Sequence, residues 1–219
     1  MKRKPKQSAT SSPQPEITYI VSAFNRPVML PVALWSIKGQ SHQDFECIVA
    51  DNADNDAIAK QHEQAVKDLR DPRFRHVRTA AKTKVSDPYW AAEWVIENLA
   101  RGRWIVLPCD DTYLMPQFAE RMLRHAQRKK AEFVWCRWPV VGQEAAGNQI
   151  MPDMGYGVWD IKIHRTPKTS FMFRRSVFTG FEGKLSRAGY CNADYFLSSQ
   201  MVAGRVRISC LPDILLVHN

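Results

Sequence analysis

RGRWIVLPCDDTYLMP, residues 101–116, places an apolar run directly before two adjacent carboxylates, Asp110 and Asp111. The apolar run, residues 104–109, is typical of a buried strand, and the two acids follow at the point where it ends. Neighbouring carboxylates repel each other, which would raise one pKa unless a cation lies beside them. A bound Mg²⁺ or Mn²⁺ ion is one candidate, because both ions take oxygen ligands. The alternative is a solvated loop in which Asp111 caps a turn.

Strand and helix patterns alternate on both sides of this stretch, from residue 16 to residue 138. Short β-branched or aromatic runs predict the strands, and apolar residues at helical spacing predict the helices. The predicted strands are 16–24, 45–52, 73–79, 103–109 and 132–138, and the predicted helices are 27–40, 57–71, 87–102 and 115–130. This alternation predicts an α/β fold with a mostly parallel central sheet and helices on both faces.

The residues after 138 follow a different pattern. Residues 139–168 are rich in Gly and Pro and weakly periodic, and a loop of this length is typical of a binding or lid segment. A strand with a following turn is predicted at 169–178, a helix at 192–204, and a strand and tail at 205–219.

Length and composition limit the class of protein. A chain of 219 residues that is 45% hydrophobic can form one sizeable globular domain. No apolar run has the length of a membrane span, and the first residues lack an apolar secretory signal, so we expect a cytoplasmic protein. The five cysteines are scattered without a CxxC pair, which predicts reduced thiols rather than disulfides or a zinc site.

The net charge is +9, and part of it lies in residues 1–15, which we predict to be a flexible basic tail. Such a tail either aids solubility or attracts an anionic partner: lipid headgroups at a membrane surface, nucleic acid or a phosphorylated substrate. The other basic residues are spread among several predicted elements. A basic nucleic-acid-binding protein is therefore the weaker alternative, because its charge would form one stripe.

Polar residues follow three of the predicted strands, at residues 22–26, 51–56 and 109–112. Ligands of open parallel sheets bind beyond the carboxyl ends of the strands. We therefore expect these three segments to meet in one binding site.

Four segments, in this order, resemble the GT-A glycosyltransferases, in particular the large inverting family 2 group. They are VSAFNRP (21–27), IVADNADND (48–56), ARGRWIVLPCDDTYLMP (100–116), and TGFEG followed by ADYFL (179–197). The resemblance implies a Rossmann-like nucleotide-binding sandwich and an enzyme that moves a sugar from a nucleoside-diphosphate sugar, in particular a UDP-sugar, to an acceptor hydroxyl.

The resemblance also implies how the chain is divided. Residues 16–219 would form a single GT-A domain after the tail. Within it, residues 16–112 would bind the nucleotide-sugar, and residues 113–219, with the long loop 139–168, would bind the acceptor.

Five residues are assigned to the donor by the resemblance. Ala23, Phe24 and Arg26 would line the nucleotide base and the ribose. Asp51 would accept a hydrogen bond from the base, as a uracil N–H requires. Asp110 would contact the ribose or a metal-bound water.

The metal and the catalytic base follow from the same resemblance. Asp111 would bind the Mn²⁺ or Mg²⁺ ion that bridges the diphosphate, and Asp194 would be the general base that deprotonates the acceptor hydroxyl. His218 either closes the metal site, as in some members of the wider fold, or is incidental. Two residues depart from the family pattern: Cys109 replaces the first acid of the metal motif, and Ala193 replaces the acid before the base.

The acceptor is expected to be a glycan, a lipid-linked compound or another hydroxyl compound. A polyanionic acceptor, including nucleic acid, is an alternative. Tyr156 and Trp159 are candidates for an acceptor platform, whereas Arg174 and Arg175 either neutralise phosphate or end a solvated strand. A nucleotidyltransferase of similar fold is a further alternative, but the loop SAFNRP (22–27) lacks the glycines typical of that class.

Overall fold

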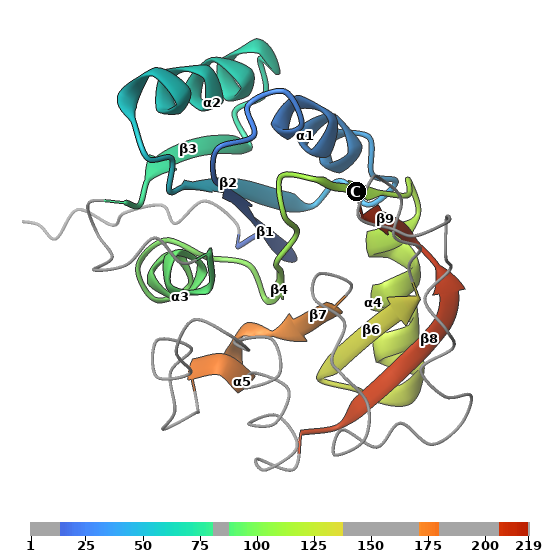
Figure 1. Cartoon of the computed structure of the whole chain (residues 1–219). Helices are drawn as coiled ribbons and strands as arrows, with labels where there is room; N and C mark the ends of the chain where they lie inside the picture. The colour runs from blue at the N-terminus through green and yellow to red at the C-terminus, as the bar shows by residue number, and fades with distance from the viewer. Residues whose placement is uncertain (1–13, 81–87, 138–170, 180–205, 219) are drawn as a thin grey trace, which may run out of the picture.

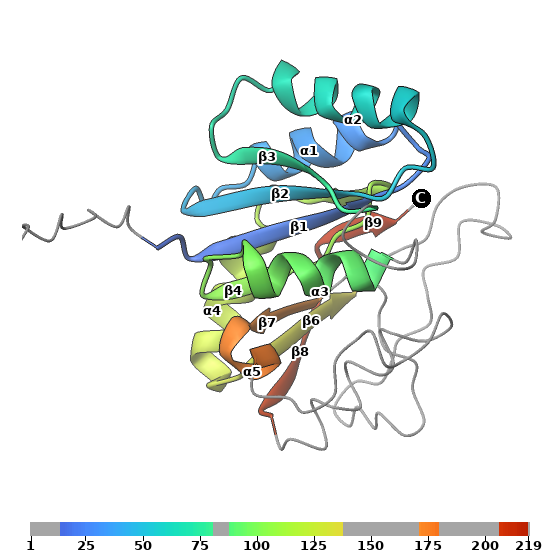
Figure 2. The same cartoon turned by 90° about the vertical axis from the view of Figure 1, so that its left-hand side faces the viewer.

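The computed structural model describes residues 14–80, 88–137, 171–179 and 206–218, and these form a sheet with helices on both faces (Figures 1 and 2). In the described part, the main sheet has seven strands in the order β3-β2-β1-β4-β7-β6-β8, and β5 and β9 form a second, two-stranded sheet. The strands are β1 (Ile17–Ala23), β2 (Phe45–Asp51), β3 (Phe74–Arg78), β4 (Trp104–Val106), β5 (Thr112–Leu114), β6 (Phe133–Arg137), β7 (Phe171–Arg174), β8 (Ile208–Ile214) and β9 (Leu216–His218). The helices are α1 (Leu30–Lys38), α2 (Asp56–Asp68), α3 (Pro88–Asn98), α4 (Phe118–Lys129) and α5 (Arg175–Thr179).

The pairing of the strands is mostly parallel. β1 pairs in parallel with both β2 and β4, β2 pairs in parallel with β3, and β6 pairs in parallel with β8. β7 is antiparallel to both of its neighbours, β4 and β6. β6 therefore runs in the same direction as β4 but is separated from it by β7. The α/β fold and the mostly parallel sheet that the alternation predicts are confirmed.

The larger differences from the sequence predictions lie in β4 and in the last two predicted strand segments. β4 ends at Val106 rather than at residue 109, because Pro108 has no N–H to donate to a neighbouring strand. The predicted strand 169–178 is a four-residue strand followed by the short helix α5. The predicted strand 205–219 contains two strands, β8 and β9, which join different sheets.

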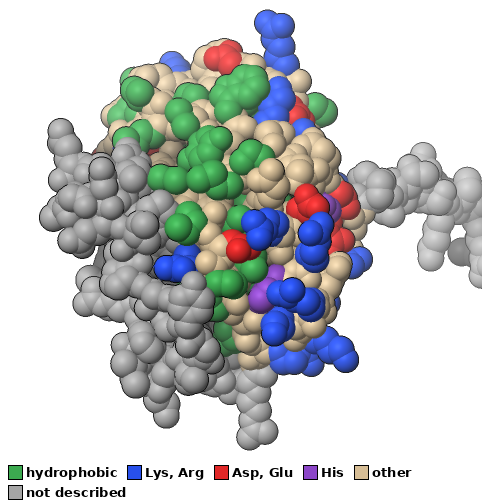
Figure 3. Space-filling view, turned by 90° about the vertical axis from the view of Figure 1, so that its right-hand side faces the viewer, with side chains coloured by type: hydrophobic (Ala, Val, Ile, Leu, Met, Phe, Trp, Pro, Cys, Tyr) green, Lys and Arg blue, Asp and Glu red, His purple; other side chains and the backbone are tan. Residues whose placement is uncertain are grey.

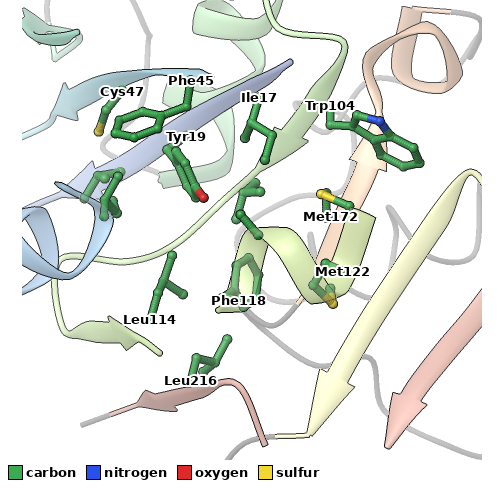
Figure 4. Packing of buried hydrophobic residues seen from close by; sticks show 14 of the residues in the cluster. Ile17, Tyr19, Phe45, Cys47, Trp104, Leu114, Phe118, Met122, Met172 and Leu216 are labelled. Carbon is green, nitrogen blue, oxygen red and sulfur yellow. The ribbon is translucent and has the colours of Figure 1, made fainter. Parts of the chain in front are cut away.

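Hydrophobic side chains form one buried cluster on each face of the main sheet. Alternate residues of β1 supply both clusters, since Tyr19 lies in the first and Ile20 in the second. The first cluster packs against α1, α2 and α4, and the second against α3 and α5. Figure 4 shows Leu114 and Leu216, from the two-stranded sheet, beside Phe118 of α4 in the first cluster.

Helix α1 has hydrophobic residues on its solvent side as well as on its buried side. Val32 and Trp35 are more than half exposed, and with Tyr113 of β5 they line a surface groove of about 310 Å³. Figure 3 shows hydrophobic side chains gathered on this face of the molecule beside Lys and Arg side chains. Among the described helices, none combines the length and the hydropathy that a membrane span requires.

Candidate active site

The carboxyl ends of β1 and β4 meet where the strand order reverses. The chain proceeds from β1 to β2 and β3 on one side, and then returns to place β4 on the other side of β1. Beyond Val106 the contact with β1 continues: Ser22 N–H donates to the Pro108 carbonyl at 3.2 Å, and Asp110 N–H donates to the Ser22 carbonyl at 3.1 Å. Such a reversal is the usual ligand position in open α/β sheets.

Asp110 and Asp111 lie at this point, and a single guanidinium bridges them. Arg26, in the loop between β1 and α1, places Nη2 at 2.7 Å from Asp110 Oδ1 and pairs through Nη1 with Asp111 Oδ2. The two carboxylate side chains are 0% and 4% exposed, whereas that of Arg26 is 45% exposed. The repulsion expected from the sequence is thus offset by Arg26, which lies 84 and 85 residues away in the chain.

The backbone holds Asp110 in place. Asp110 Oδ2 accepts the backbone N–H of Phe24 at 3.0 Å, so this side chain is fixed to the loop after β1. Burial raises the pKa of Asp110, and the neighbouring Asp111 raises it further, while the Phe24 N–H and Arg26 oppose the rise. Asp110 therefore anchors the loop between β1 and α1.

The loops after β1 and β2 are joined by polar contacts. Asn25 and Asp54 form a reciprocal pair, in which Asn25 Nδ2 donates to Asp54 Oδ2 at 2.6 Å and Asp54 N–H donates to Asn25 Oδ1 at 3.1 Å. Asn52 N–H donates to the Ala23 carbonyl at 2.9 Å. Phe24 is 41% exposed on this joined rim and offers a ring face to a ligand.

Asp51 ends β2 with its carboxylate turned toward α2 and fully buried. His62 Nδ1 lies 3.0 Å from Oδ1, and His76 Nε2 lies 2.8 Å from Oδ2. Burial works to raise the pKa of Asp51, but hydrogen bonds from His62, His76 and the Ala53 N–H outweigh it and hold the pKa well below its usual range. A nucleobase N–H could bind Asp51 if His76, whose side chain is 15% exposed, releases Oδ2.

The turn that carries the acids leads into the two-stranded sheet. Cys109 N–H donates to Thr112 Oγ1 at 3.2 Å, and Thr112 N–H donates to the Cys109 carbonyl at 3.1 Å. Thr112 is the register partner of His218 in the antiparallel pair of β5 and β9. The backbone of His218 therefore pairs with the residue that directly follows Asp111. The side chain of His218 lies outside the described residues.

The acid pair fits a hard divalent cation. In the described ranges, no group of three or more His, Cys, Asp or Glu side chains surrounds one metal position. Asp110 and Asp111 would thus supply one or two carboxylates, which is how Mg²⁺ commonly binds beside substrate phosphates and water. That the guanidinium of Arg26 pairs with both carboxylates shows that a cation is favoured here.

Other sequence candidates are not part of this site or lie outside the described residues. Arg174 is the register partner of Trp104, at the amino end of β4, and the side chain of Arg175 donates to the Gly102 carbonyl. Both arginines therefore lie at the opposite edge of the sheet from Asp111. The candidates Tyr156, Trp159 and Asp194 fall outside the described residues.

Four polar residues of the site were not singled out from the sequence: Asn25, Asp54, His62 and His76. His62 carries a signal that could have identified it, because it lies between Ala59 and Val66 in the buried stripe of α2. A histidine in such a stripe requires a buried partner. The Asn25–Asp54 pair carries no comparable signal, because it depends on how two loops meet.

Comparison with known proteins extends these observations. A family model described as glycosyl transferase family 2 matches residues 18–181, more than half of the chain. Among curated proteins, none matches significantly.

Three solved structures share the fold at low sequence identity. The crystal structure of S. aureus TarS has a TM-score of 0.74 at 14% identity, covering 93% of this chain and 36% of that chain. S. aureus TarS 1–349 in complex with UDP-GlcNAc has a TM-score of 0.71 at 14% identity, covering 92% and 58%. Mannosyltransferase PcManGT from Pyrobaculum calidifontis, in complex with GDP-Man and Mn²⁺, has a TM-score of 0.64 at 18% identity, covering 94% and 57%. The chain thus spans about a third to three fifths of the length of these solved chains.

Proposed function

Because the chain belongs to glycosyl transferase family 2, we propose that it transfers a sugar from a nucleoside-diphosphate sugar to a hydroxyl group of an acceptor. The observation that carries this proposal is the buried pair Asp110–Asp111 at the reversal point of the sheet. Beside it lies a loop with an exposed aromatic ring, Phe24, and a half-exposed cationic side chain, Arg26. A ring face suits the nucleoside, and a carboxylate pair suits the counter-ion of the diphosphate.

The donor is proposed to be a UDP-sugar bound along the joined loops after β1 and β2. Ala23, Phe24 and Arg26 would line the base and the ribose, and Asp51 would accept the N–H of the base after His76 moves. Asp110 would contact the ribose or a metal-bound water. The two TarS complexes and the PcManGT complex contain UDP, UDP-GlcNAc and GDP-Man, so structures of this fold accommodate different bases.

Asp111 is proposed to hold a Mn²⁺ or Mg²⁺ ion, with His218 as a second candidate ligand. When bound, the ion would supply positive charge to the diphosphate as it leaves the sugar. Cys109 takes the position of an acid in the family motif, and a thiol is a poor ligand for a hard cation. The carboxylates therefore carry this role.

The proposed chemistry is a single displacement that inverts the anomeric carbon. The acceptor oxygen forms a bond to that carbon while the bond to the diphosphate oxygen breaks, and the electron pair leaves with the nucleoside diphosphate. Asp194 would take the acceptor proton, a contribution of ~10²–10⁴ in rate. The acceptor is proposed to be a glycan hydroxyl held by residues 113–219.

A thermal-shift panel tests this function. UDP, GDP, UDP-GlcNAc and GDP-mannose would be added to the full chain with and without Mn²⁺. We expect UDP and UDP-GlcNAc to raise the melting temperature in a Mn²⁺-dependent way, and Asp111→Asn to remove the Mn²⁺-dependent part. Asp213→Asn is the matched control, because this carboxylate pairs with Arg121 on α4.

Product formation is the second measurement. Asp194→Asn should abolish transfer of the sugar to acceptor glycans, and with it the acceptor-dependent release of UDP, while the donor still raises the melting temperature. Full turnover by the purified Asp194→Asn variant would refute the assignment of the base. If none of the four nucleotides changes the melting temperature, the proposed function is wrong.

A further inference from the structure

We propose that Arg26 is an exchangeable counter-ion: it neutralises Asp110 and Asp111 before the donor binds, and it moves to the donor diphosphate when a divalent cation binds Asp111. This inference rests on the proposed function, because the diphosphate is the anion that Arg26 would meet. It changes the role of Arg26 from a residue that lines the nucleoside to one that contacts the leaving group.

The first observation is the geometry of the pair. One guanidinium uses two different nitrogens to bind one oxygen of each carboxylate, Asp110 Oδ1 and Asp111 Oδ2. A divalent cation that binds Asp111 Oδ2 would need the position that Arg26 Nη1 holds. Because like charges repel each other more strongly where the carboxylates are shielded from water, the divalent cation and Arg26 would compete for Asp111.

The second observation is the difference in burial between the partners. The two carboxylates are almost fully buried, but the Arg26 side chain is 45% exposed and reaches them from the loop between β1 and α1. The guanidinium can therefore rotate away on its own side chain while the backbone stays in place. Asp110 keeps its bond from the Phe24 N–H during this movement, so the loop stays anchored.

The third observation is the charge balance. Asp110, Asp111 and Arg26 together carry one negative charge when both acids are ionised. Replacing Arg26 by a divalent cation neutralises the acid pair and leaves the guanidinium of Arg26 beside it without these two carboxylate partners. A guanidinium binds phosphate oxygens with two parallel hydrogen bonds, so the released Arg26 suits the diphosphate.

The exchange predicts opposite effects of one substitution on two binding steps. Without donor, Arg26→Ala should bind Mn²⁺ about tenfold more tightly than the unchanged chain, because the competing cation is gone. With Mn²⁺ saturating, the same variant should bind UDP about tenfold more weakly, because a diphosphate ligand is lost. Arg26→Lys keeps the charge but not the paired hydrogen-bond geometry of a guanidinium. Its affinities for Mn²⁺ and for UDP should each lie between those of the unchanged chain and those of Arg26→Ala.

Mn²⁺ binding is measured on the full chain from the electron paramagnetic resonance signal of free Mn²⁺, and UDP binding by calorimetry. Arg121→Ala is the matched control, since Arg121 is 49% exposed and pairs with Asp213 of β8 rather than with Asp110 or Asp111. It should change neither affinity. Adding Asp111→Asn to Arg26→Ala should remove the gain in Mn²⁺ affinity, which ties the competition to this carboxylate.

The outcomes separate this inference from the proposed function. If Arg26→Ala binds Mn²⁺ no more tightly than the unchanged chain, or if neither binds Mn²⁺, the exchange is wrong even where sugar transfer is detected. If the opposite effects on Mn²⁺ and UDP are found but no sugar is transferred, the exchange stands and the proposed function fails. Thermal unfolding of each variant shows whether it is folded, and the Arg26→Lys variant decides the exchange where Arg26→Ala is unfolded.

Discussion

Gly102 packs against the backbone of Thr18 so closely that no side chain fits between them. A Cβ at residue 102 would lie 2.3 Å from the Thr18 nitrogen and 2.6 Å from the Ile17 carbonyl carbon. Gly102 N–H also donates to Thr18 Oγ1 at 2.8 Å, and this hydroxyl in turn donates to Glu46. The turn before β4 is thereby fixed to β1, which sets where Asp110 and Asp111 emerge at the other end.

Gly102→Ala should therefore destabilise the protein strongly. The added methyl group meets backbone atoms that cannot rotate away, so we expect a loss of about 3 kcal/mol in the free energy of unfolding. Urea denaturation measures this difference. Gly39→Ala is the control, because its Cβ would come no nearer than 3.4 Å to any atom, the Trp35 carbonyl oxygen, and its effect should stay within about 1 kcal/mol.

Asp51→Asn should be costly at neutral pH. The substitution removes the carboxylate whose oxygens His62 and His76 contact in a buried position, and losing hydrogen bonds to a charged group costs about 2 kcal/mol in the free energy of unfolding. Asp56→Asn is the control, since that side chain is 93% exposed, and it should cost less than about 1 kcal/mol. A cost for Asp51→Asn no larger than that of the control would contradict the buried network.

The same carboxylate should make stability depend on pH in the acid range. Burial opposes ionisation of Asp51, but the bonds from His62 and His76 prevail, so its pKa is lower in the folded protein than the value of about 3.9 expected when unfolded. Its stabilising contribution is complete above that unfolded value and is lost as the pH falls toward the folded pKa. Below about pH 4, unfolding free energy should fall more steeply for the unchanged chain than for Asp51→Asn.

Phe24→Ala should weaken nucleotide binding. Stacking of a base on an aromatic ring contributes ~1–3 kcal/mol, so we expect a rise of about tenfold or more in the Kd of UDP. Phe24→Tyr keeps the ring and should bind UDP like the unchanged chain. Equal affinities for Phe24→Ala and Phe24→Tyr would show that the ring does not contact the base.

The Asn25–Asp54 pair should act as one unit. Asn25→Ala removes both bonds of the pair, whereas Asp54→Ala removes only the one to Asp54 Oδ2, because the other is donated by the Asp54 backbone N–H. The double variant should therefore lose little more stability than the Asn25→Ala variant alone. We expect a coupling of about 1 kcal/mol in a double-mutant cycle of unfolding free energies. Additive effects would mean that the two loops are held together by other contacts.

The strands and helices of the β1–β4 half of the sheet, and their parallel pairing, could be predicted from the sequence, because short apolar strands alternate there with helices of clear spacing. The place of β7 could not, because β7 is separated from β6 by residues 138–170 and nothing in its four residues specifies which strands it joins. The pairing of Thr112 with His218 could not be predicted either, because the two residues lie far apart in the sequence and belong to strands of three residues. A short strand acquires its partner from tertiary packing rather than from its own pattern.

The site shows the same division. Asp110 and Asp111 could be identified because they end an apolar run, and their repulsion correctly indicated a neighbouring cation. The sequence suggested a metal ion as this cation. It did not reveal that Arg26 neutralises the two carboxylates, because contacts between residues 85 positions apart leave no local signal. His62 was missed although its position in the buried stripe of α2 marks it.

The pairing of β5 with β9 also bears on how the protein is made. Thr112, one residue after Asp111, takes its strand partner from residues 216–218. During synthesis, the first half of the sheet can form while those residues are still untranslated, but the strand beside the acid pair cannot. In a ribosome-bound nascent chain that ends before residue 216, strands β1 to β4 would therefore be paired, but β5, which follows Asp110 and Asp111, would still lack its partner strand β9.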